Sequence, residues 1–195
     1  MSSDCPSIQC RCGKVDMSIE MPIPDTSARI TCYCKDCRAF STHLGAEEDI
    51  GTRGASDLLH VAPRRLRFCN GAEHMDCLRL SPKGLFRWYA ACCNSPMFVT
   101  LPKDVPFISV VVPRMVDVVP PDPVATVFSE QALDGQGPLP VNHGRLTVVV
   151  RFFRRIAGAL LTGHFRNHPL FEAGRPMAEP TVLSLEERKA ATRLP

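Results

Sequence analysis

The chain has 195 residues, of which 45% are hydrophobic and 22% are charged, and this balance is typical of one soluble globular domain. Its formal net charge of +3 is too small to indicate nucleic-acid binding. We expect no membrane span, because no stretch approaches the roughly 18 apolar residues that a transmembrane helix needs. The first residues lack the basic and apolar segments of a secretory signal, so a cytoplasmic protein is expected.

Residues 1–115 carry the pattern of a β domain. Short β-prone runs recur between turn signals, at residues 14–21, 29–33, 66–70, 75–80, 85–91, 97–101 and 107–112. The segment Ser81-Pro82-Lys83-Gly84 predicts a hairpin turn between two of them. Residues 36–43 contain no helix breaker, so a short helix is expected there. The sequence therefore predicts a mainly β domain.

Residues 116–195 predict a helical C-terminal extension packed on the same domain. A proline-rich connection comes first, with one strand expected at 126–128. Apolar residues then recur at three- and four-residue spacing, which predicts an amphipathic helix at about 145–162, with Asn142 as its N-cap and Gly163 as its stop. Ser184 and Glu187 form a capping box, which predicts a short terminal helix that runs to about Arg193.

The predicted amphipathic helix is also basic. Arg145, Arg151, Arg154 and Arg155 lie along it, and His164, Arg166 and His168 follow. These cations could meet an anionic partner or an acidic membrane surface. We favour a plainer interpretation, in which they form the solvated face of a helix whose apolar face packs against the sheet.

Paired cysteines are the strongest chemical signal. Ten cysteines in a chain of this length are too few for a disulfide scaffold, and a Cys-x-Cys bridge would be strained. Reduced cysteines at close spacing instead favour a soft divalent metal, most commonly zinc. The sequence thus predicts a metal-binding protein with one or two zinc ions.

Cys32-x-Cys34-x-x-Cys37 forms the most compact cysteine cluster. Three sulfurs can hold one zinc and leave a fourth corner for a substrate thiol, which is a feature of catalytic rather than structural sites. We therefore predict that these three cysteines form an open catalytic zinc site. The alternative is that a distant side chain closes the site, and the candidates are Cys69, Cys77, His43 and His74.

A second predicted site joins the two ends of the β domain. Cys10-x-Cys12 needs ligands from elsewhere, and the adjacent pair Cys92-Cys93 could supply them. Neighbouring residues on a regular strand point to opposite faces, so both sulfurs can reach one metal only if the backbone bends there. Asn94-Ser95-Pro96 makes such a bend credible. A structural zinc is expected at this site.

The order of these motifs resembles that of the glutathione-dependent formaldehyde-activating family. The matching segments are Cys10-Arg11-Cys12-Gly13, the run from Cys32 to Cys37, and Cys93-Asn94-Ser95, within residues 5–112. The resemblance implies a β-tent fold similar to Mss4-like domains, a structural zinc, and a zinc linked to catalysis at the three-cysteine motif. It also implies carbon–sulfur lyase chemistry, in which a thiol such as glutathione and a small aldehyde such as formaldehyde form an adduct.

This sequence departs from that family at the late motif, since Ala90 stands where the family has its first cysteine, so either Cys92 substitutes for it or the site is altered. Two other functions remain open. One is a non-catalytic zinc scaffold or partner-binding module, and the other is a reductase of the methionine sulfoxide type, which needs a separate nucleophilic cysteine. Homo-oligomerisation is also left open.

The remaining cysteines and histidines receive simpler interpretations. Cys5, Cys69 and Cys77 are predicted to be small buried hydrophobic residues. His43 is the best general-base candidate because it is nearest in sequence to the three-cysteine cluster, whereas His60 and His74 are expected at surface or satisfied polar positions. Trp88 and Tyr89 are predicted to pack in the core rather than line a pocket.

Overall fold

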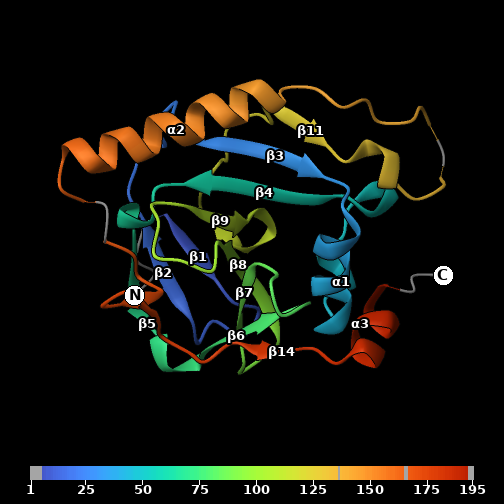
Figure 1. Ribbon diagram of the computed structural model, residues 1–195, viewed down its shortest axis with the longest axis horizontal. Helices are drawn as coiled ribbons and strands as arrows, with labels where there is room; N and C mark the ends of the chain where they lie inside the picture. Colours follow the sequence, from blue (N-terminus) through green and yellow to red (C-terminus); the bar gives the residue numbers. More distant parts are fainter. Residues whose placement is uncertain (1–5, 136, 165–166, 193–195) are drawn as a thin grey trace.

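Two β-sheets form the body of the computed structural model, which describes residues 6–135, 137–164 and 167–192 (Figure 1). The first sheet has the order β10 (Met115–Val116), β1 (Ser7–Gln9), β2 (Asp16–Ile19) and β5 (Leu66–Asn70). The second has the order β11 (Ala125–Val127), β3 (Ala28–Cys32), β4 (Ser56–Val61), β9 (Ile108–Val111), β8 (Ser95–Thr100), β7 (Phe86–Ala90), β6 (Met75–Arg79) and β14 (Thr181–Val182). A small ribbon pairs β12 (Phe171–Glu172) with β13 (Arg175–Pro176).

The helices are few and mostly short. The α-helices are α1 (Lys35–His43), α2 (Arg145–Leu161) and α3 (Leu185–Thr192). Single 3-10 turns lie at Glu47–Asp49, Thr52–Gly54, Pro63–Arg65, Ala72–His74, Val112–Arg114 and Ser129–Gln131. The predicted mainly β architecture with a few helices is therefore confirmed.

The main core contains apolar side chains from both large sheets. Met17, Leu59 and Trp88 are fully buried in one cluster to which both sheets contribute. Trp88 donates its indole N–H to Thr100 Oγ1 at 3.0 Å, so the one polar group of this side chain is satisfied inside the core. Cys77 also belongs to this cluster and is buried as predicted, whereas Cys69 is exposed on β5, contrary to the prediction. Cys5 lies outside the described residues.

The runs with clear strand signals correspond to strands of the structure, but six strands of the described residues were not predicted. Four of them, β10, β12, β13 and β14, are only two residues long, and the other two are β1 and β4. β1 is only three residues long, and β4 lies between β3 and β9 in the large sheet. Leu58, Leu59, His60 and Val61 of β4 are all buried, because this strand is covered on both faces and shows no alternation of polar and apolar residues. The turn predicted at residues 81–84 connects β6 to β7.

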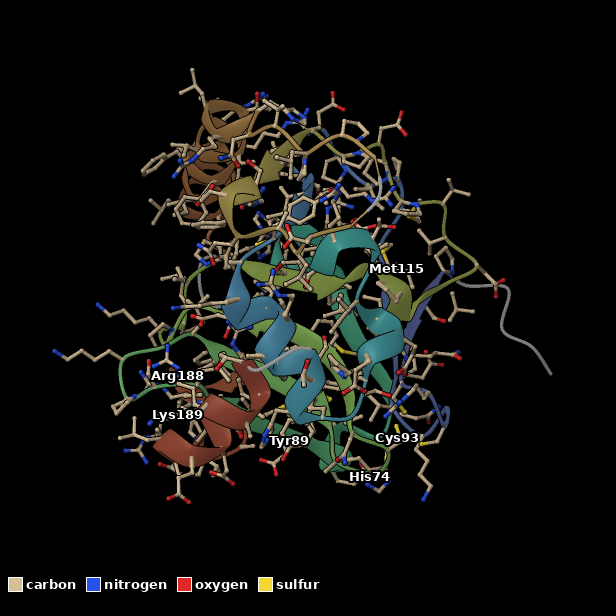
Figure 2. All side chains as sticks on the ribbon, turned by 90° about the vertical axis from the view of Figure 1, so that its right-hand side faces the viewer. His74, Tyr89, Cys93, Met115, Arg188 and Lys189 are labelled. Atoms are coloured by element: carbon tan, nitrogen blue, oxygen red, sulfur yellow. The ribbon has the colours of Figure 1, made fainter. Side chains whose placement is uncertain are left out.

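The C-terminal extension adds an edge strand to each side of the large sheet. β11 pairs in parallel with β3, and β14 pairs in parallel with β6. The predicted capping box opens α3, since Glu187 N–H donates to Ser184 Oγ and Ser184 N–H donates to Glu187 Oε2. α3 packs beside α1, where Arg188 lies 3.7 Å from Asp36 (Figure 2).

α2 agrees with its predicted range but not with its predicted orientation. Gly144, at φ +71°, precedes the first turn in place of Asn142, whose side chain instead accepts from the N–H of Ser129. The face toward the sheet carries Arg151 and Arg155, which donate to the carbonyl oxygens of Ser27 and Thr26. The prediction that the main apolar stripe faces inward was wrong, because most of the large apolar side chains of α2 are exposed, and Val148 and Phe152 pack inward between the arginines instead.

These exposed side chains of α2 are Leu146, Val149, Val150, Phe153, Leu160 and Leu161. Despite this composition, neither α2 nor any other described helix is long and apolar enough to cross a bilayer.

Candidate metal centres

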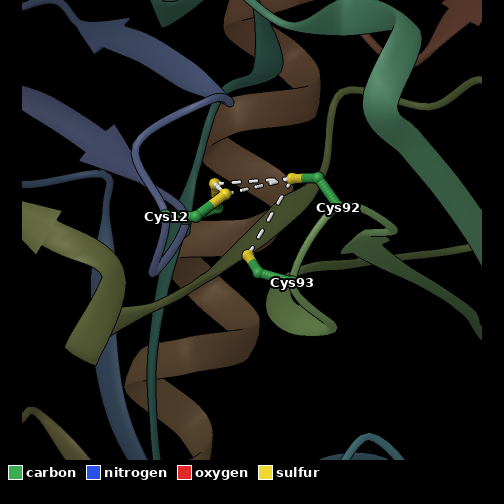
Figure 3. A group of neighbouring side chains, drawn as sticks. Cys12, Cys92 and Cys93 are labelled. Carbon is green, nitrogen blue, oxygen red and sulfur yellow. Dashed lines mark hydrogen bonds between the residues drawn. The ribbon is translucent and has the colours of Figure 1, made fainter.

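Four cysteines from two distant turns converge on one point. Cys10 and Cys12 lie in the turn between β1 and β2, and Cys92 and Cys93 lie in the turn between β7 and β8 (Figure 3). The Sγ of Cys92 lies 3.4 Å from that of Cys12, 3.9 Å from that of Cys10 and 3.9 Å from that of Cys93. All four sulfurs are within 4.8 Å of one another.

These distances suit a tetrahedral metal ion. With metal–sulfur bonds of about 2.3 Å, the sulfurs of a tetrahedral site stand about 3.8 Å apart. The separation of 3.6 Å between Cys10 and Cys12 falls close to this value, as do the separations from Cys92. The four-cysteine group can therefore hold a metal ion, and its four sulfurs would complete the coordination shell with protein ligands.

The backbone explains how two adjacent cysteines reach the same point. The chain turns after β7, where Cys93 N–H donates to the carbonyl oxygen of Ala90 at 3.2 Å, and Asn94 adopts a positive φ of 53°. Gly13 also has a positive φ, of 74°, which a glycine adopts without strain. Cys92 thus supplies a sulfur to the four-cysteine group, although Ala90 stands where the late motif of the similar family has a cysteine.

Hydrogen bonds around the four-cysteine group stabilise negative charge on sulfur. Ser95 Oγ lies 3.1 Å from Cys93 Sγ and accepts the N–H of Arg11 at 2.9 Å, so its hydroxyl proton is free to point at the sulfur. Burial acts to raise the pKa of Cys93, but the hydrogen bond from Ser95 and those from Cys12 outweigh it and lower this pKa to about 6. Val15 N–H donates to Cys10 Sγ at 3.3 Å.

A second group of three cysteines lies at the junction of β3 and α1. Cys32 ends β3 and is buried, Cys34 is the N-cap of α1, and Cys37 lies in its first turn. Their sulfurs lie within 4.8 Å of one another, with 3.8 Å between Cys37 and Cys32. The chain turns tightly here, because Cys37 N–H donates to the carbonyl oxygen of Cys34 at 3.1 Å. This three-cysteine group can also hold a metal ion.

The three sulfurs share negative charge unequally. The thiols of Cys32 and Cys37 act as hydrogen-bond donors toward Cys34 and lower its pKa far below its usual range, and Arg87 adds to this effect. The same interactions raise the pKa of Cys32. Three thiolates this close repel one another, so a divalent cation is the natural charge partner for the complete set.

No fourth ligand joins the three-cysteine group within residues 6–135, 137–164 and 167–192. The side chains considered as closing ligands all lie in other surroundings. Cys69 is exposed on β5, Cys77 is in the core, and His74 lies 3.7 Å from Glu73. His43, in the last turn of α1, lies near Glu187 of α3 and not at the cysteines, so its role as the general base of this site is not supported.

A cavity of about 420 Å³ opens beside the three-cysteine group. Its walls combine apolar side chains with a few polar ones. They are formed by Ile30, Cys32, Cys34, Lys35, Asp36, Cys37, Leu58, His60, Leu85, Arg87, Val99, Phe107, Ser109, Phe128 and Gln131. The two cysteine groups therefore differ in form, since one is closed by four sulfurs and the other meets a cavity large enough for a small organic ligand.

Three polar side chains of this cavity have unused hydrogen-bonding capacity. Arg87 is 3% exposed and stacks over the ring of Phe40 at 5.5 Å, yet its Nη1 has no partner. Likewise, His60 Nδ1 and Ser109 Oγ are buried without partners. Burial, aided by the charge of Arg155, lowers the pKa of His60 to about 3, so this imidazole is neutral. The prediction that His60 is a surface or satisfied residue was wrong.

The register of the sheet sets the position of His60 along the cavity. Cys32 pairs with Ser56, whereas His60 pairs with Ala28, four residues further along the two strands. At about 3.3 Å per residue this offset is about 13 Å. His60 therefore lies at the far end of the cavity from the cysteines, beyond direct proton transfer to a group held by their sulfurs.

Comparison with known proteins identifies the family of this chain. A model of a family of unknown function, DUF6151, matches residues 1–181. The chain belongs to DUF6151.

No curated protein matches the DUF6151 chain. Among solved structures, it is similar to a crystal structure of a Rhodobacter sphaeroides protein from a structural genomics programme, at 18% identity and a TM-score of 0.42. That similarity covers 58% of this chain and 91% of the other.

Sequence reasoning named all seven cysteines that the structure of this DUF6151 protein brings together, but it missed the polar cavity residues. Neither Arg87 nor Ser109 belongs to a recognisable local motif, so nothing in the sequence pattern marks them as cavity residues. The one available signal was His60, a single polar residue inside the apolar run Leu58-Leu59-His60-Val61.

Proposed function

We propose that this DUF6151 protein is a zinc-dependent carbon–sulfur lyase that forms or cleaves adducts between a thiol and a small aldehyde. The observation that carries the proposal is the three-cysteine group, which lacks a fourth protein ligand among the described residues and borders a cavity of about 420 Å³. Catalytic zinc sites keep an exchangeable position of this kind, whereas structural sites are closed. We further propose that the two sheets form a β-tent fold of the Mss4-like group.

The two cysteine groups take different roles in this proposal. Cys10, Cys12, Cys92 and Cys93 hold a structural zinc that joins the β1–β2 turn to the β7–β8 turn. Cys32, Cys34 and Cys37 hold the second zinc. A zinc ion bound there supplies Lewis acidity that favours the thiolate form of a substrate thiol at neutral pH. All nine described cysteines are free, which suits the reducing interior of a cell, and we place the protein in the cytoplasm.

The proposed reaction is the addition of a thiol to an aldehyde. The thiol sulfur forms a bond to the carbonyl carbon, the π bond of the carbonyl breaks, and the thiol proton ends on the former carbonyl oxygen. In the reverse direction the carbon–sulfur bond breaks and the same proton returns to sulfur. No oxidant or reductant is needed. The apolar cavity walls, such as Ile30, Leu58 and Phe107, keep bulk water from the reacting carbonyl.

Arg87 provides positive charge beside the sulfurs. Its guanidinium is buried at the cavity wall and acts electrostatically on Cys34 and Cys37. Adding a substrate thiolate to three cysteine thiolates increases the local negative charge, so a fixed cation at this point favours thiolate binding over thiol binding.

The far end of the cavity suits the rest of an extended thiol. Ser109 Oγ and His60 Nδ1 lie there without partners, and a ligand that offers hydrogen-bonding groups would satisfy them. Glutathione is long enough to place its sulfur at the cysteines and its polar groups toward this end. We therefore propose glutathione, or a thiol of similar length, as the co-substrate and formaldehyde as the aldehyde.

Native mass spectrometry of untagged protein, purified without chelator, tests the proposal. We expect two zinc ions and an added mass of one glutathione when the reduced tripeptide is supplied. Cys34→Ser should abolish the glutathione adduct and remove one zinc. Cys69→Ser, at an exposed cysteine outside both groups, is the matched control and should leave both unchanged.

Activity measurements complete the test. Formation of the glutathione–formaldehyde adduct should depend on protein and be lost in Cys34→Ser but not in Cys69→Ser. Two zinc ions without any thiol adduct or activity would contradict the lyase and favour a zinc scaffold. Protein that carries no metal would refute both.

A further inference from the structure

The exposed face of α2 is apolar along its whole length. Leu146, Phe153 and Leu161 are 76%, 61% and 88% exposed, and these residues span the first to the last turn of the helix. With Val149, Val150 and Leu160 they form one stripe at helical spacing, which we call the α2 stripe. An exposed apolar surface of this extent marks a site of interaction rather than an ordinary solvated face.

The charges near the α2 stripe have a single sign over a long segment. From Gly135 to Phe171 the sequence contains no aspartate or glutamate, whereas Arg145 and Arg154 are exposed on α2 and His164 is exposed just beyond it. Glu130 interacts electrostatically with Arg145, at the N-terminal end of α2. Arg154, beside the middle of the stripe, has no ion-pair partner among the described residues.

The position of α2 leaves the stripe accessible. Figure 1 shows α2 along one edge of the molecule, where it covers β3 and β11 on its inner side and no helix or strand of the described residues lies over its outer side. Arg151 and Arg155 fix the inner side by donating to the carbonyl oxygens of Ser27 and Thr26. Phe152 packs against Phe107, whose ring is 5.7 Å away. The helix is thus anchored with its apolar face outward.

We propose that α2 docks in the plane of an anionic phospholipid bilayer. Aliphatic and phenylalanine side chains with flanking arginines are what an interfacial helix requires, because the apolar side chains enter the acyl boundary and the cations meet lipid phosphates. A helix of 17 residues is about 25 Å long, so it lies on the surface rather than across the membrane. This proposal does not depend on the proposed enzymatic function.

Charge also argues against a second copy of this chain as the occupant. Phe153 is the middle residue of α2, so two helices packed antiparallel about a two-fold axis would bring their Arg154 side chains together at the centre. With no acid on the helix to offset them, the two guanidinium groups would repel. An anionic lipid surface removes this conflict.

Vesicle flotation of the full, metal-loaded chain tests the proposal. One set of vesicles contains phosphatidylcholine alone, and the other contains phosphatidylcholine with phosphatidylserine. We expect binding to the anionic vesicles that weakens as salt is raised, and little binding to the neutral ones. Arg154→Gln should weaken binding about fivefold, and Phe153→Asp should weaken it by more than about tenfold.

Matched controls come from α3, which lies on the other side of the molecule from α2 (Figures 1 and 2). Leu185→Asp alters an apolar side chain that is 77% exposed, and Lys189→Gln removes an exposed cation; neither should change binding. If Phe153→Asp does not fold, Leu161→Asp at a more exposed position replaces it.

Equal binding to both kinds of vesicle, or binding to neither, would overturn the proposal. So would a dimer in solution that Phe153→Asp converts to a monomer, because the α2 stripe would then be an interface between copies. Loss of vesicle binding in the α2 variants, with unchanged binding in the α3 controls, would support it.

Discussion

The two cysteine groups of this DUF6151 protein use the same ligand chemistry in different surroundings. The four-cysteine group lies between two hairpin turns, and its own sulfurs complete a tetrahedron. The three-cysteine group lies where a strand enters a helix, and its missing corner coincides with a cavity. The comparison teaches that cysteine groups of one chain can differ in closure. Four sulfurs complete one coordination shell, whereas three sulfurs leave a position that borders a cavity, and the proposed difference in function rests on that position.

Removing one cysteine from each group should give the largest difference in stability between the two sites. Cys12→Ser should lower the free energy of unfolding by at least about 4 kcal/mol, because the metal that joins the two turns is lost and metal-binding energy at a structural site is folding energy. Cys34→Ser should also lose one metal ion but lower stability far less. Denaturant unfolding combined with metal analysis gives both quantities, and equal stability losses would contradict the assignment of roles.

Lowering the pH is a second way to compare the two cysteine groups, because protonation of the cysteines releases a bound metal. Protonation of the buried imidazole of His168 also lowers stability in acid, and its contribution must be separated first. Leu170 N–H donates to His168 Nδ1 at 3.2 Å, so the other nitrogen, Nε2, carries the proton toward the Phe107 carbonyl oxygen at 3.4 Å. Burial lowers the pKa of His168 from 6.5 to about 4, and the bond to Phe107 opposes this only in part.

The sign of the resulting pH dependence is fixed by these two values. Above pH 6.5 the imidazole is neutral in both states; between pH 6.5 and about 4 only the unfolded chain binds the proton, so the free energy of unfolding falls by about 3 kcal/mol in total. His168→Gln should remove this part of the slope, whereas the part that comes from His60, whose pKa burial lowers to about 3, stays the same in both proteins. Unfolding curves from pH 4 to 7 for both proteins measure it. Because both proteins keep the same cysteines and His60, identical slopes would show that His168 does not contribute and would contradict the prediction.

Ser95→Ala tests whether the zinc affinity of one cysteine group can be changed without changing that of the other. The hydroxyl of Ser95 lies 3.1 Å from Cys93 Sγ, and outer-shell hydrogen bonds of this kind are worth about 10- to 100-fold in metal affinity. Competition with a chromophoric chelator should therefore show weaker zinc binding at the four-cysteine group alone. Ser109→Ala, which removes a buried hydroxyl in the cavity beside the other group, should leave both zinc affinities unchanged.

The local sequence pattern predicted many of the strands and helices. It failed for elements whose burial or orientation depends on contacts with distant segments of the chain. Strands with turn signals on both sides, such as β5 and β7, were predicted closely. β4 was not predicted, because burial on both faces removes the alternation of polar and apolar residues. The orientation of α2 was wrong because apolar residues occur all around the helix, and the contacts of Arg151 and Arg155 with Thr26 and Ser27 select its inner face.

The same division holds for the candidate site. Close spacing named the cysteines, since ligands that are near in sequence stay near in space. Arg87, His60 and Ser109 come from β7, β4 and β9, and only long-range strand pairing brings them to one cavity. No local sequence motif therefore contains the cavity side chains that would select a substrate.

Arg87 offers the smallest and most specific way to test the difference between the groups. Arg87→Met keeps an unbranched stem beside the ring of Phe40 but removes the cation that acts electrostatically on Cys34 and Cys37. Glutathione affinity of the zinc-loaded protein should fall about tenfold, because a thiolate would then enter a cavity without its compensating charge. Calorimetric titration with reduced glutathione measures this change. Arg79→Met is the matched control, since Arg79 stacks on Phe86 at 5.2 Å and does not line the cavity. An equal loss of affinity in both variants would mean that Arg87 acts through packing, whereas a loss in Arg87→Met alone would tie the open corner of the three-cysteine group to thiolate binding.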